Sequence, residues 1–193
     1  MKRVTALLLA AMIITTGLIT PAMAAEDDVP ETYSNAYVVM DAKTGQVLLQ
    51  KNMYEKEYPA SITKILTTAL GLTYAKPEDR ITVSQETVSD VWKWGETTHL
   101  ALEPGEIITL KDALYGAMVE SANDCANAIA QAVSGSLTDF AELMNQKARD
   151  IGCRDTYFIT PNGLDGTVKK ENGEESAHAT TAADLARIMR YCT

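Results

Sequence analysis

The stretch "YPASITKILTTALGL", residues 58 to 72, decides how the rest of the chain is interpreted. Its apolar residues recur at the i, i+3, i+4, i+7 and i+8 positions of a helix packed on a core, and they are Ile62, Ile65, Leu66, Ala69 and Leu70. Within the stretch, Ser61 precedes Lys64 by three residues, so both side chains are expected on the same helical face. This spacing suits a nucleophile and its proton acceptor, but it also fits a capping serine followed by a solvated lysine.

The position of Ser61 at the start of the predicted helix is compatible with the chemical interpretation, although this stretch alone favours a capping serine with a solvated lysine. Ser61 follows Pro59 and Ala60 directly, so it falls in the first helical turn. Unpaired N–H groups and the positive end of the helix dipole there favour negative charge beside the Ser61 oxygen. A neutral Lys64 amine could accept the serine proton, provided that burial and nearby positive charge lower its pKa well below about 10.4.

A second polar constellation lies in "ESANDCANAIA", residues 120 to 130. We predict that one helix ends at Glu120 and that the next begins near Asp124. Ser121 and Asn123 would then lie on a short connection, free to point into a cleft. The alternative is that one of the two merely caps the following helix.

The N-terminus has the three parts of a secretory signal peptide. Lys2 and Arg3 precede an apolar run, and the small-residue tripeptide AMA ends at Ala24. We therefore predict a signal peptide over residues 1–24, cleaved after Ala24, and an exported, extracytoplasmic protein of the cell envelope. A transmembrane anchor is the alternative, but it needs about 20 apolar residues and this run contains threonines, a glycine and a proline. The acidic residues 25–34 are predicted to be a disordered lead-in.

Composition excludes several classes of partner. The net charge of −9 becomes more negative once the signal peptide, which carries only basic charge, is removed, and this argues against nucleic acid as a partner. Two histidines and three cysteines show no metal-ligand spacing, so neither a metal site nor any cofactor is predicted. An odd cysteine count excludes a closed disulfide framework, and Cys125 and Cys153 are predicted to be buried free thiols.

The remaining pattern predicts a hairpin followed mostly by helices. A β-hairpin is expected over residues 35–52, with its turn at Asp41 to Gly45, and residues 79–109 are expected to be irregular. Helices are expected at 110–120, 124–133, 137–151 and 182–193. Thr109 and Asp112 would form a capping box at the start of the first of these helices, and Leu110, Leu114, Ala117 and Met118 would line one of its faces. Gly152 would be the C-cap of the third helix, and Thr181 with Asp184 would cap the start of the last one. Residues 157–166 are expected to be a loop and 169–175 an exposed turn.

Several of these segments together resemble a known family. They are "DAKTGQVL", "PASITKILT", "LEPGEIITLKDALYGAMVESAND", "FAELMNQKARDIGCRDTYFITPNGLDG" and "HATTAADLARIM", in this order. They resemble the serine D-alanyl-D-alanine carboxypeptidases among the low-molecular-mass penicillin-binding proteins, the S11 peptidases, from Ala36 to Arg190. The resemblance implies an α+β, β-lactamase/transpeptidase-like fold, with an antiparallel sheet flanked by helices and joined to an all-α subdomain. Residues 35–193 would be a partial catalytic domain.

The resemblance also implies roles for the candidate residues. Ser61 would form the acyl-enzyme with the penultimate D-alanine of a peptidoglycan stem peptide ending in D-Ala-D-Ala, with Lys64 as proton acceptor. Ser121 would pass a proton toward the departing D-alanine, and Asn123 would bind the substrate backbone. The backbone N–H of Ser61 would form one arm of the oxyanion hole. β-Lactams would be covalent inhibitors.

The third motif of the family, a Lys-Thr-Gly strand after Asn123, does not occur in these residues. Lys43, Thr44 and Gly45 spell it, but they lie on the first hairpin turn, where a glycine supplies the positive φ of a tight turn. We therefore expect residues 1–193 to be the N-terminal portion of a longer protein or a truncated product, without the C-terminal strands. Such a chain is expected to be impaired or inactive, and its hairpin to expose an unpaired edge and an apolar face.

Three rival interpretations stay open. A class A β-lactamase shares Ser61 and Lys64, but that family has Asp at the position of Ala122 and needs a deacylating Glu. Glu142 is the superficial candidate, and we predict that it is a solvated helical residue. A non-catalytic fragment that binds stem peptides or another cell-wall component is the second rival. In the third, Cys125 is the nucleophile, although neither histidine has a sequence cue as its partner.

Overall fold

The computed structural model describes residues 31–93, 97–169 and 173–193. The predicted signal peptide and residues 25–30 of the predicted lead-in lie outside the described residues. Residues 34–193 form one structural unit, and residues 31–33 before it have neither helix nor strand. The elements in chain order are β1 (Tyr37–Met40), β2 (Val47–Lys51), the 3-10 turn η2 (Ala60–Ile62), α1 (Thr63–Tyr74), β3 (Arg80–Thr82), α2 (Gln85–Lys93), β4 (Ile107–Thr109), α3 (Leu110–Val119), α4 (Asn123–Ser134), α5 (Leu137–Ile151), β5 (Thr167–Lys169), β6 (Glu175–Ala177) and α6 (Ala182–Tyr191).

The predicted N-terminal hairpin is confirmed. β1 pairs antiparallel with β2, and the turn between them is closed by Thr44, whose N–H and hydroxyl both donate to Asp41 Oδ1. Gly45 has φ +76°, so residues Lys43 to Gly45 form a turn, as expected. Helix α6 contacts β1, while Val39, Val47 and Leu48 are exposed apolar residues of the hairpin.

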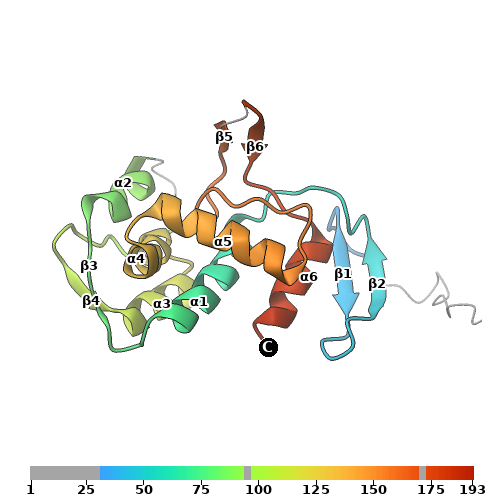
Figure 1. Cartoon of the computed structure of the whole chain (residues 1–193), viewed down its shortest axis with the longest axis horizontal. Helices are drawn as coiled ribbons and strands as arrows, with labels where there is room; N and C mark the ends of the chain where they lie inside the picture. Colours follow the sequence, from blue (N-terminus) through green and yellow to red (C-terminus); the bar gives the residue numbers. More distant parts are fainter. Residues whose placement is uncertain (1–30, 94–96, 170–172) are drawn as a thin grey trace, which may run out of the picture. The chain divides into compact units, whose positions relative to one another are not determined.

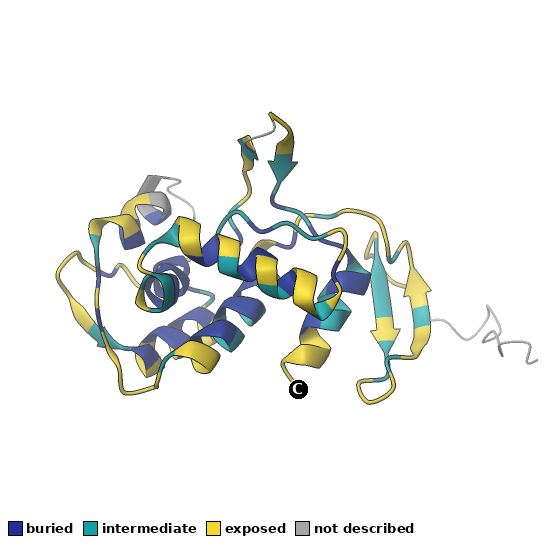
Figure 2. Cartoon of the chain, in the orientation of Figure 1, coloured by how far each residue is buried: buried dark blue, intermediate teal, exposed yellow. Residues whose placement is uncertain are grey.

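Helix α4 is the centre of the helical part of the molecule (Figure 1). It contacts α1, α2, α3 and α5, which surround it in the view. Its first eight residues, Asn123 to Ala130, are all buried, and this buried part of the helix is dark blue in Figure 2. Small and apolar residues such as Ala126, Ala128 and Ile129 fill much of this buried surface, and the buried polar side chains of Asp124 and Asn127 are hydrogen-bonded.

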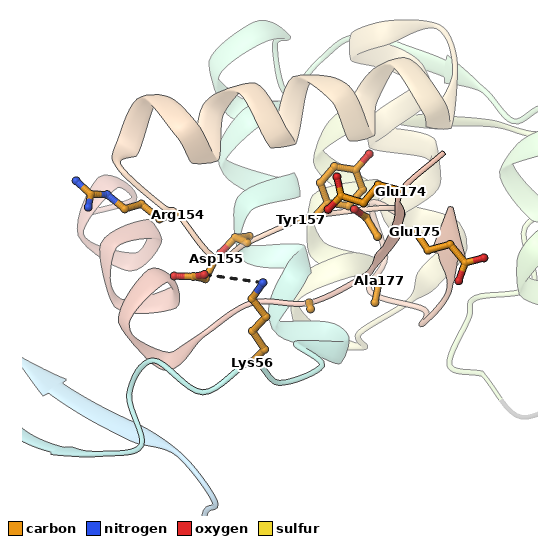
Figure 3. A pocket seen from close by; sticks show the side chains of 10 residues that line it. Lys56, Arg154, Asp155, Tyr157, Glu174, Glu175 and Ala177 are labelled. Atoms are coloured by element: carbon orange, nitrogen blue, oxygen red, sulfur yellow. Dashed lines mark ion pairs between the residues drawn. The ribbon is translucent and has the colours of Figure 1, made fainter. Parts of the chain in front are cut away.

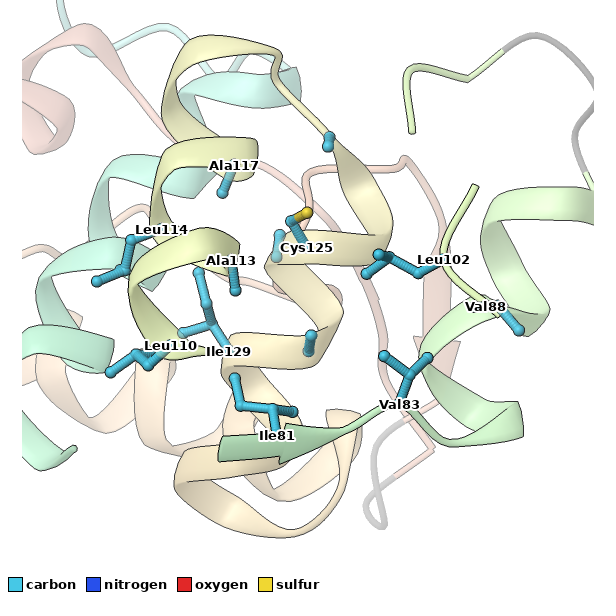
Figure 4. Packing of buried hydrophobic residues seen from close by; sticks show 13 residues of the cluster. Ile81, Val83, Val88, Leu102, Leu110, Ala113, Leu114, Ala117, Cys125 and Ile129 are labelled. Carbon is cyan, nitrogen blue, oxygen red and sulfur yellow. The ribbon is translucent and has the colours of Figure 1, made fainter. Parts of the chain in front are cut away.

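Two apolar clusters pack against α4 from different sides. One lies among α2, α3, α4 and the β3–β4 ladder and includes Leu110, Leu114 and Ile129 (Figure 4). The other joins α1, α4, α5 and α6 through Leu66, Leu70, Phe140, Met144 and Ile188. Because α4 has residues in both clusters and α1 packs against α3, α4 and α5, the start of each helix has a fixed place relative to the other.

The expectation that residues 79–109 are irregular is wrong in part. β3 pairs antiparallel with β4, and α2 lies between them along the chain, capped by Ser84, whose Oγ accepts the N–H of Thr87. α2 buries only a narrow face, with Val88 and Val91 almost fully buried. Two apolar residues one turn apart are too few to give a clear helical period, so the sequence pattern missed this helix.

Two predicted core residues are also exposed. Ile62 is 48% exposed and Met118 is 50% exposed. Ile62 belongs to the 3-10 turn η2, whose period is shorter than that of the α-helix, so its side chain falls out of line with Leu66 and Leu70. The buried face of α1 instead includes Thr63, Lys64 and Thr67, which are polar.

The predicted helix ends are confirmed at α3, α5 and α6. Thr109 and Asp112 form the capping box of α3, Gly152 ends α5, and Thr181 caps α6 by accepting the N–H of Asp184. The loop at 157–166 is confirmed as well. Lys169 and Glu175 end the paired strands β5 and β6 rather than lying in an open turn, and residues 170–172 between them lie outside the described part of the chain.

Replacing Thr109 with Ala should lower the free energy of unfolding by about 1 kcal/mol, because the N–H of Asp112 loses its acceptor and the carboxylate of Asp112 loses the Thr109 hydroxyl. Chemical denaturation of both proteins measures the difference. Lys111→Ala, at an exposed neighbouring position, is the control and should change stability by less than half as much. Equal effects of the two substitutions would contradict a specific contribution of the capping box.

Candidate active site

Ser61 lies in a tightly bent turn at the start of α1. Residues Ala60 to Ile62 form η2, which runs directly into α1, and Ser61 itself is exposed. Ala60 has φ +47°, a left-handed conformation that costs energy for a residue with a side chain. The turn therefore presents Ser61 to solvent at the N-terminal end of a helical segment, where backbone N–H groups lack helical acceptors.

Lys64 is fully buried and its amine meets three oxygen atoms. Its side chain is 1% exposed. Lys64 Nζ lies 2.9 Å from Ser61 Oγ, 3.4 Å from Ser121 Oγ and 2.9 Å from the carbonyl oxygen of Asn162. The structure thus brings Ser61, Lys64 and Ser121 together, and it excludes a solvated lysine at position 64.

Burial lowers the pKa of Lys64 from its ordinary value of 10.5 to about 8. The cause is the loss of hydration of the ammonium form. A lysine with this pKa is neutral in a substantial fraction of molecules near neutral pH. A neutral amine has two N–H bonds and one lone pair, so it can donate to Asn162 and Ser121 while it accepts a proton from Ser61.

Ser121 is held beside Lys64 by the junction of α3 and α4. Ser121 has φ +57°, and the N–H of Ala122, the next residue, donates to the carbonyl of Gly116 in α3. On the α4 side, the buried carboxylate of Asp124 accepts the N–H groups of Leu100 and Leu102. The junction is therefore fixed from both of its ends.

Asn123 is less free than the sequence predicts. It is the first residue of α4 rather than part of the connection, and it is 6% exposed. Its backbone N–H donates to the carbonyl of Thr98. Within the residues that the structure describes, its side-chain amide makes no hydrogen bond.

The loop at 157–166 completes the surroundings of Lys64, a role that no pattern in the sequence predicted. Besides the Asn162 carbonyl on Lys64, the carbonyl of Pro161 accepts the hydroxyl of Thr67 at 2.6 Å. Gly163, at φ +92°, lies so close to the nucleophile turn that a Cβ there would be 1.9 Å from the carbonyl oxygen of Ala60. The sequence "PNG" at residues 161–163 indicates a turn, but no local pattern indicates which helix this turn contacts.

The side chain of Asn162 fixes its own backbone. Its amide Nδ2 donates to Asn127 Oδ1 of α4 at 3.0 Å, and its Oδ1 accepts the N–H of Leu164 at 2.8 Å. Asn127 in turn donates to the carbonyl of Thr87 in α2. The carbonyl that meets Lys64 is therefore anchored to two helices.

His178 is buried next to the same loop. Its Nε2 lies 3.0 Å from Thr63 Oγ1, and its Nδ1 accepts the N–H of Ile159 at 3.0 Å. Burial lowers the pKa of His178 to about 4, so the ring is neutral at pH 7. These contacts of His178 were not predicted from the sequence.

The cysteines offer no alternative nucleophile. Cys125 and Cys153 are buried free thiols, as predicted, and burial raises the pKa of each to about 12. A thiol with such a pKa is protonated at neutral pH and is a poor nucleophile. Cys192 is a free, exposed thiol whose pKa is also raised by partial burial.

Other features of the described residues lie apart from Ser61. A cavity of about 330 Å³ opens beside the β5–β6 hairpin, lined in part by Lys56, Arg154 and Asp155, with a Lys56–Asp155 ion pair at 3.8 Å (Figure 3). In the described part of the chain, no three His, Cys, Asp or Glu side chains gather in a way that could hold a metal ion. The same residues contain no helix with the length and apolar character needed to cross a bilayer.

The sequence and fold of the chain are similar to those of known proteins. The model of the S11 peptidases, described as D-alanyl-D-alanine carboxypeptidase, matches residues 22–193. The carboxypeptidase DacF of Bacillus subtilis is 33% identical over 98% of this chain, and DacC of Escherichia coli is 36% identical over 75% of it. The crystal structure of penicillin binding protein 6B from Escherichia coli superposes on 84% of this chain with a TM-score of 0.72 and 29% identity.

The chain spans about half of these proteins. It covers 47% of DacF, 38% of DacC and 50% of the penicillin binding protein 6B chain. The fold is accordingly α+β and of the penicillin-binding-protein type, with helices and small antiparallel sheets.

Proposed function

The chain belongs to the S11 family of D-alanyl-D-alanine carboxypeptidases, and we propose that it carries the acylating site of a serine carboxypeptidase that trims the terminal D-alanine from peptidoglycan stem peptides. The observation that carries the proposal is the contact of 2.9 Å between Ser61 Oγ and the buried amine of Lys64. A serine hydroxyl is a weak nucleophile at neutral pH, and a neutral amine at hydrogen-bond distance is what activates it.

In the proposed mechanism, Ser61 Oγ attacks the carbonyl carbon of the penultimate D-alanine while its proton passes to Lys64. The backbone N–H of Ser61 donates to the oxyanion that forms. As the bond to the terminal D-alanine breaks, Lys64 returns the proton through Ser121, whose Oγ is 3.4 Å from Lys64 Nζ, to the leaving amine. Water then hydrolyses the ester on Ser61. The side-chain amide of Asn123 would bind the peptide backbone of the substrate.

Localisation and inhibition follow from the same assignment. Residues 1–24 would act as the signal peptide, and the catalytic domain would lie in the cell envelope beyond the cytoplasmic membrane, where peptidoglycan is found. Residues 35–193 would form part of this domain. β-Lactams would acylate Ser61, in keeping with the name of the penicillin binding protein that the chain resembles. The mechanism uses no metal or cofactor.

The pH dependence of acylation tests the role of Lys64. Because the proton acceptor must be neutral and its pKa is about 8, the rate of Ser61 labelling should rise with pH and level off above pH 8. At pH 6 about 1% of the amine is neutral, so the rate should be roughly 50-fold lower than at pH 8. The measurement uses a fluorescent penicillin and the full-length gene product. A flat profile between pH 6 and 9 would exclude Lys64 as the proton acceptor.

The same labelling experiment distinguishes the rival functions. Glu142 is exposed on α5, as predicted, and within the described residues no hydrogen bond joins it to Ser61 or Lys64. We therefore expect a long-lived penicilloyl adduct, whereas rapid turnover of penicillin would favour a β-lactamase. A protein that binds stem peptides but is never labelled would favour the non-catalytic interpretation. Ser61→Ala is the control, and it should remove the label entirely.

A further inference from the structure

His178 occupies a bridging position next to the candidate site, but it contacts no reacting atom. It follows β6 directly and its side chain is 0% exposed. One ring nitrogen, Nδ1, lies 3.0 Å from the N–H nitrogen of Ile159 and 3.4 Å from that of Thr160. The other, Nε2, lies 3.0 Å from Thr63 Oγ1. The ring therefore links the loop at 157–166 to the first residue of α1.

The hydrogen-bond network fixes the protonation state of the ring. Backbone N–H groups can only donate, so Nδ1 must carry a lone pair and accept from Ile159 and Thr160. In a neutral imidazole the proton is then on Nε2, which donates it to Thr63 Oγ1. A proton on Nδ1 would point at two N–H groups and break the link to the loop.

The two segments that His178 joins carry the partners of Lys64. Thr63 immediately precedes Lys64, and Ile159 and Thr160 immediately precede Pro161 and Asn162. The backbone of His178 also donates to the carbonyl of Gly166, at the far end of the same loop. The nucleophile turn and the 157–166 loop are therefore joined at two points. Lys64 donates to the Asn162 carbonyl at one point, and His178 links Thr63 to the loop at the other.

We propose that His178 is a positioning residue for the acylation of Ser61. Its neutral ring sets the distance between the nucleophile turn and the 157–166 loop, so that the Asn162 carbonyl keeps the Lys64 amine against Ser61 Oγ. The proposal rests on the proposed function of Ser61 and Lys64. It assigns His178 no proton transfer of its own.

Two amide substitutions separate the two halves of the bridge. An asparagine side chain can place an acceptor near the position of Nδ1, whereas a glutamine can place a donor near the position of Nε2. His178→Asn should therefore keep the loop but release Thr63, and His178→Gln should keep Thr63 but release the loop. Each should slow labelling of Ser61 by a fluorescent penicillin about 10- to 100-fold. The penicillin concentration that gives the half-maximal rate should change little, because the proposal gives His178 no contact with the penicillin.

Thr63 provides a matched pair that leaves the histidine in place. Thr63→Val removes the hydroxyl and should slow labelling as much as His178→Asn does, while Thr63→Ser keeps the hydroxyl and should label at nearly the wild-type rate. The double variant Thr63→Val with His178→Asn should be no slower than either single variant, because both break the same contact. Additive losses would overturn the proposal. If neither His178 variant folds by circular dichroism, the Thr63 pair decides the question.

The ring itself gives a spectroscopic readout that does not depend on activity. The protein has two histidines, and the second, His99, is exposed. In ¹⁵N-labelled protein at pH 7, His178 should have a protonated Nε2 and an unprotonated Nδ1, and Thr63→Val should shift the Nε2 resonance. A protonated Nδ1 would overturn the proposal, as would undiminished labelling of the His178 variants. Failure of the full-length wild-type gene product to be labelled would overturn both the proposed function and this role, even with the expected ring spectrum.

Discussion

Replacing Lys64 with Met should slow the acylation of Ser61 by a fluorescent penicillin about 10³-fold or more, while the protein stays folded. General-base catalysis contributes about 10² to 10⁴ to a rate, and methionine has nearly the length of lysine but no basic group. Lys64→Arg should be as slow, because the guanidinium group does not lose its proton in proteins. Stopped labelling reactions, analysed on gels, measure the rate.

The control for the Lys64 variants is Lys111→Met. Lys111 lies on the exposed side of α3, and its removal should leave the labelling rate unchanged. Circular dichroism should give the same helix content for all the variants. If Lys64→Met or Lys64→Arg labels within tenfold of the wild type, another group takes the proton of Ser61.

Replacing Gly163 with Ala should lower the free energy of unfolding by about 3 kcal/mol or more and slow Ser61 labelling severely. The added Cβ would lie 1.9 Å from the carbonyl oxygen and 2.5 Å from the carbonyl carbon of Ala60, which are backbone atoms that cannot rotate away. The positive φ of 92° adds a cost for any residue with a side chain. The loop must move outward, and the Asn162 carbonyl then leaves Lys64.

Gly166→Ala is the matched control in the same loop. A Cβ at Gly166 meets no atom within 4 Å, so this substitution should change stability by less than about 1 kcal/mol and leave labelling intact. Denaturation curves and labelling rates of the two variants make the comparison. Equal stability of the two variants would mean that the loop does not press against the nucleophile turn.

Local sequence signals predicted those helix ends and turns that are stabilised by residues close together in the sequence. The Thr109–Asp112 capping box and the Gly152 cap placed helix ends, and Gly45 placed the hairpin turn. These signals depend on residues a few positions apart, which a linear pattern contains. α2 escaped because its buried face is narrow and its supporting contacts come from α4.

The candidate residues of the site could be named from the sequence, but the groups that surround Lys64 could not. Ser61, Lys64 and Ser121 come from motifs, yet the sequence left open whether Lys64 is solvated. The loop around Asn162 contacts Lys64, and His178 contacts the neighbouring Thr63. Neither segment carries a local sequence signal for a partner so distant along the chain. The start of α4 was predicted one residue too late, near Asp124, whereas the helix begins at Asn123.

The contacts around Lys64 also bear on the order in which the protein folds. They join residues separated by 57 positions at Ser121, 98 at Asn162 and, through the neighbouring Thr63, 115 at His178. Contacts of such long sequence separation form late in folding, because a large loop must close before they contribute any stability. Ser61 therefore exists early in the nascent chain as an ordinary hydroxyl group. On the proposed mechanism it would become a nucleophile only when the segment around His178 has joined the folded protein, so we expect a partly folded molecule to have no acylating activity.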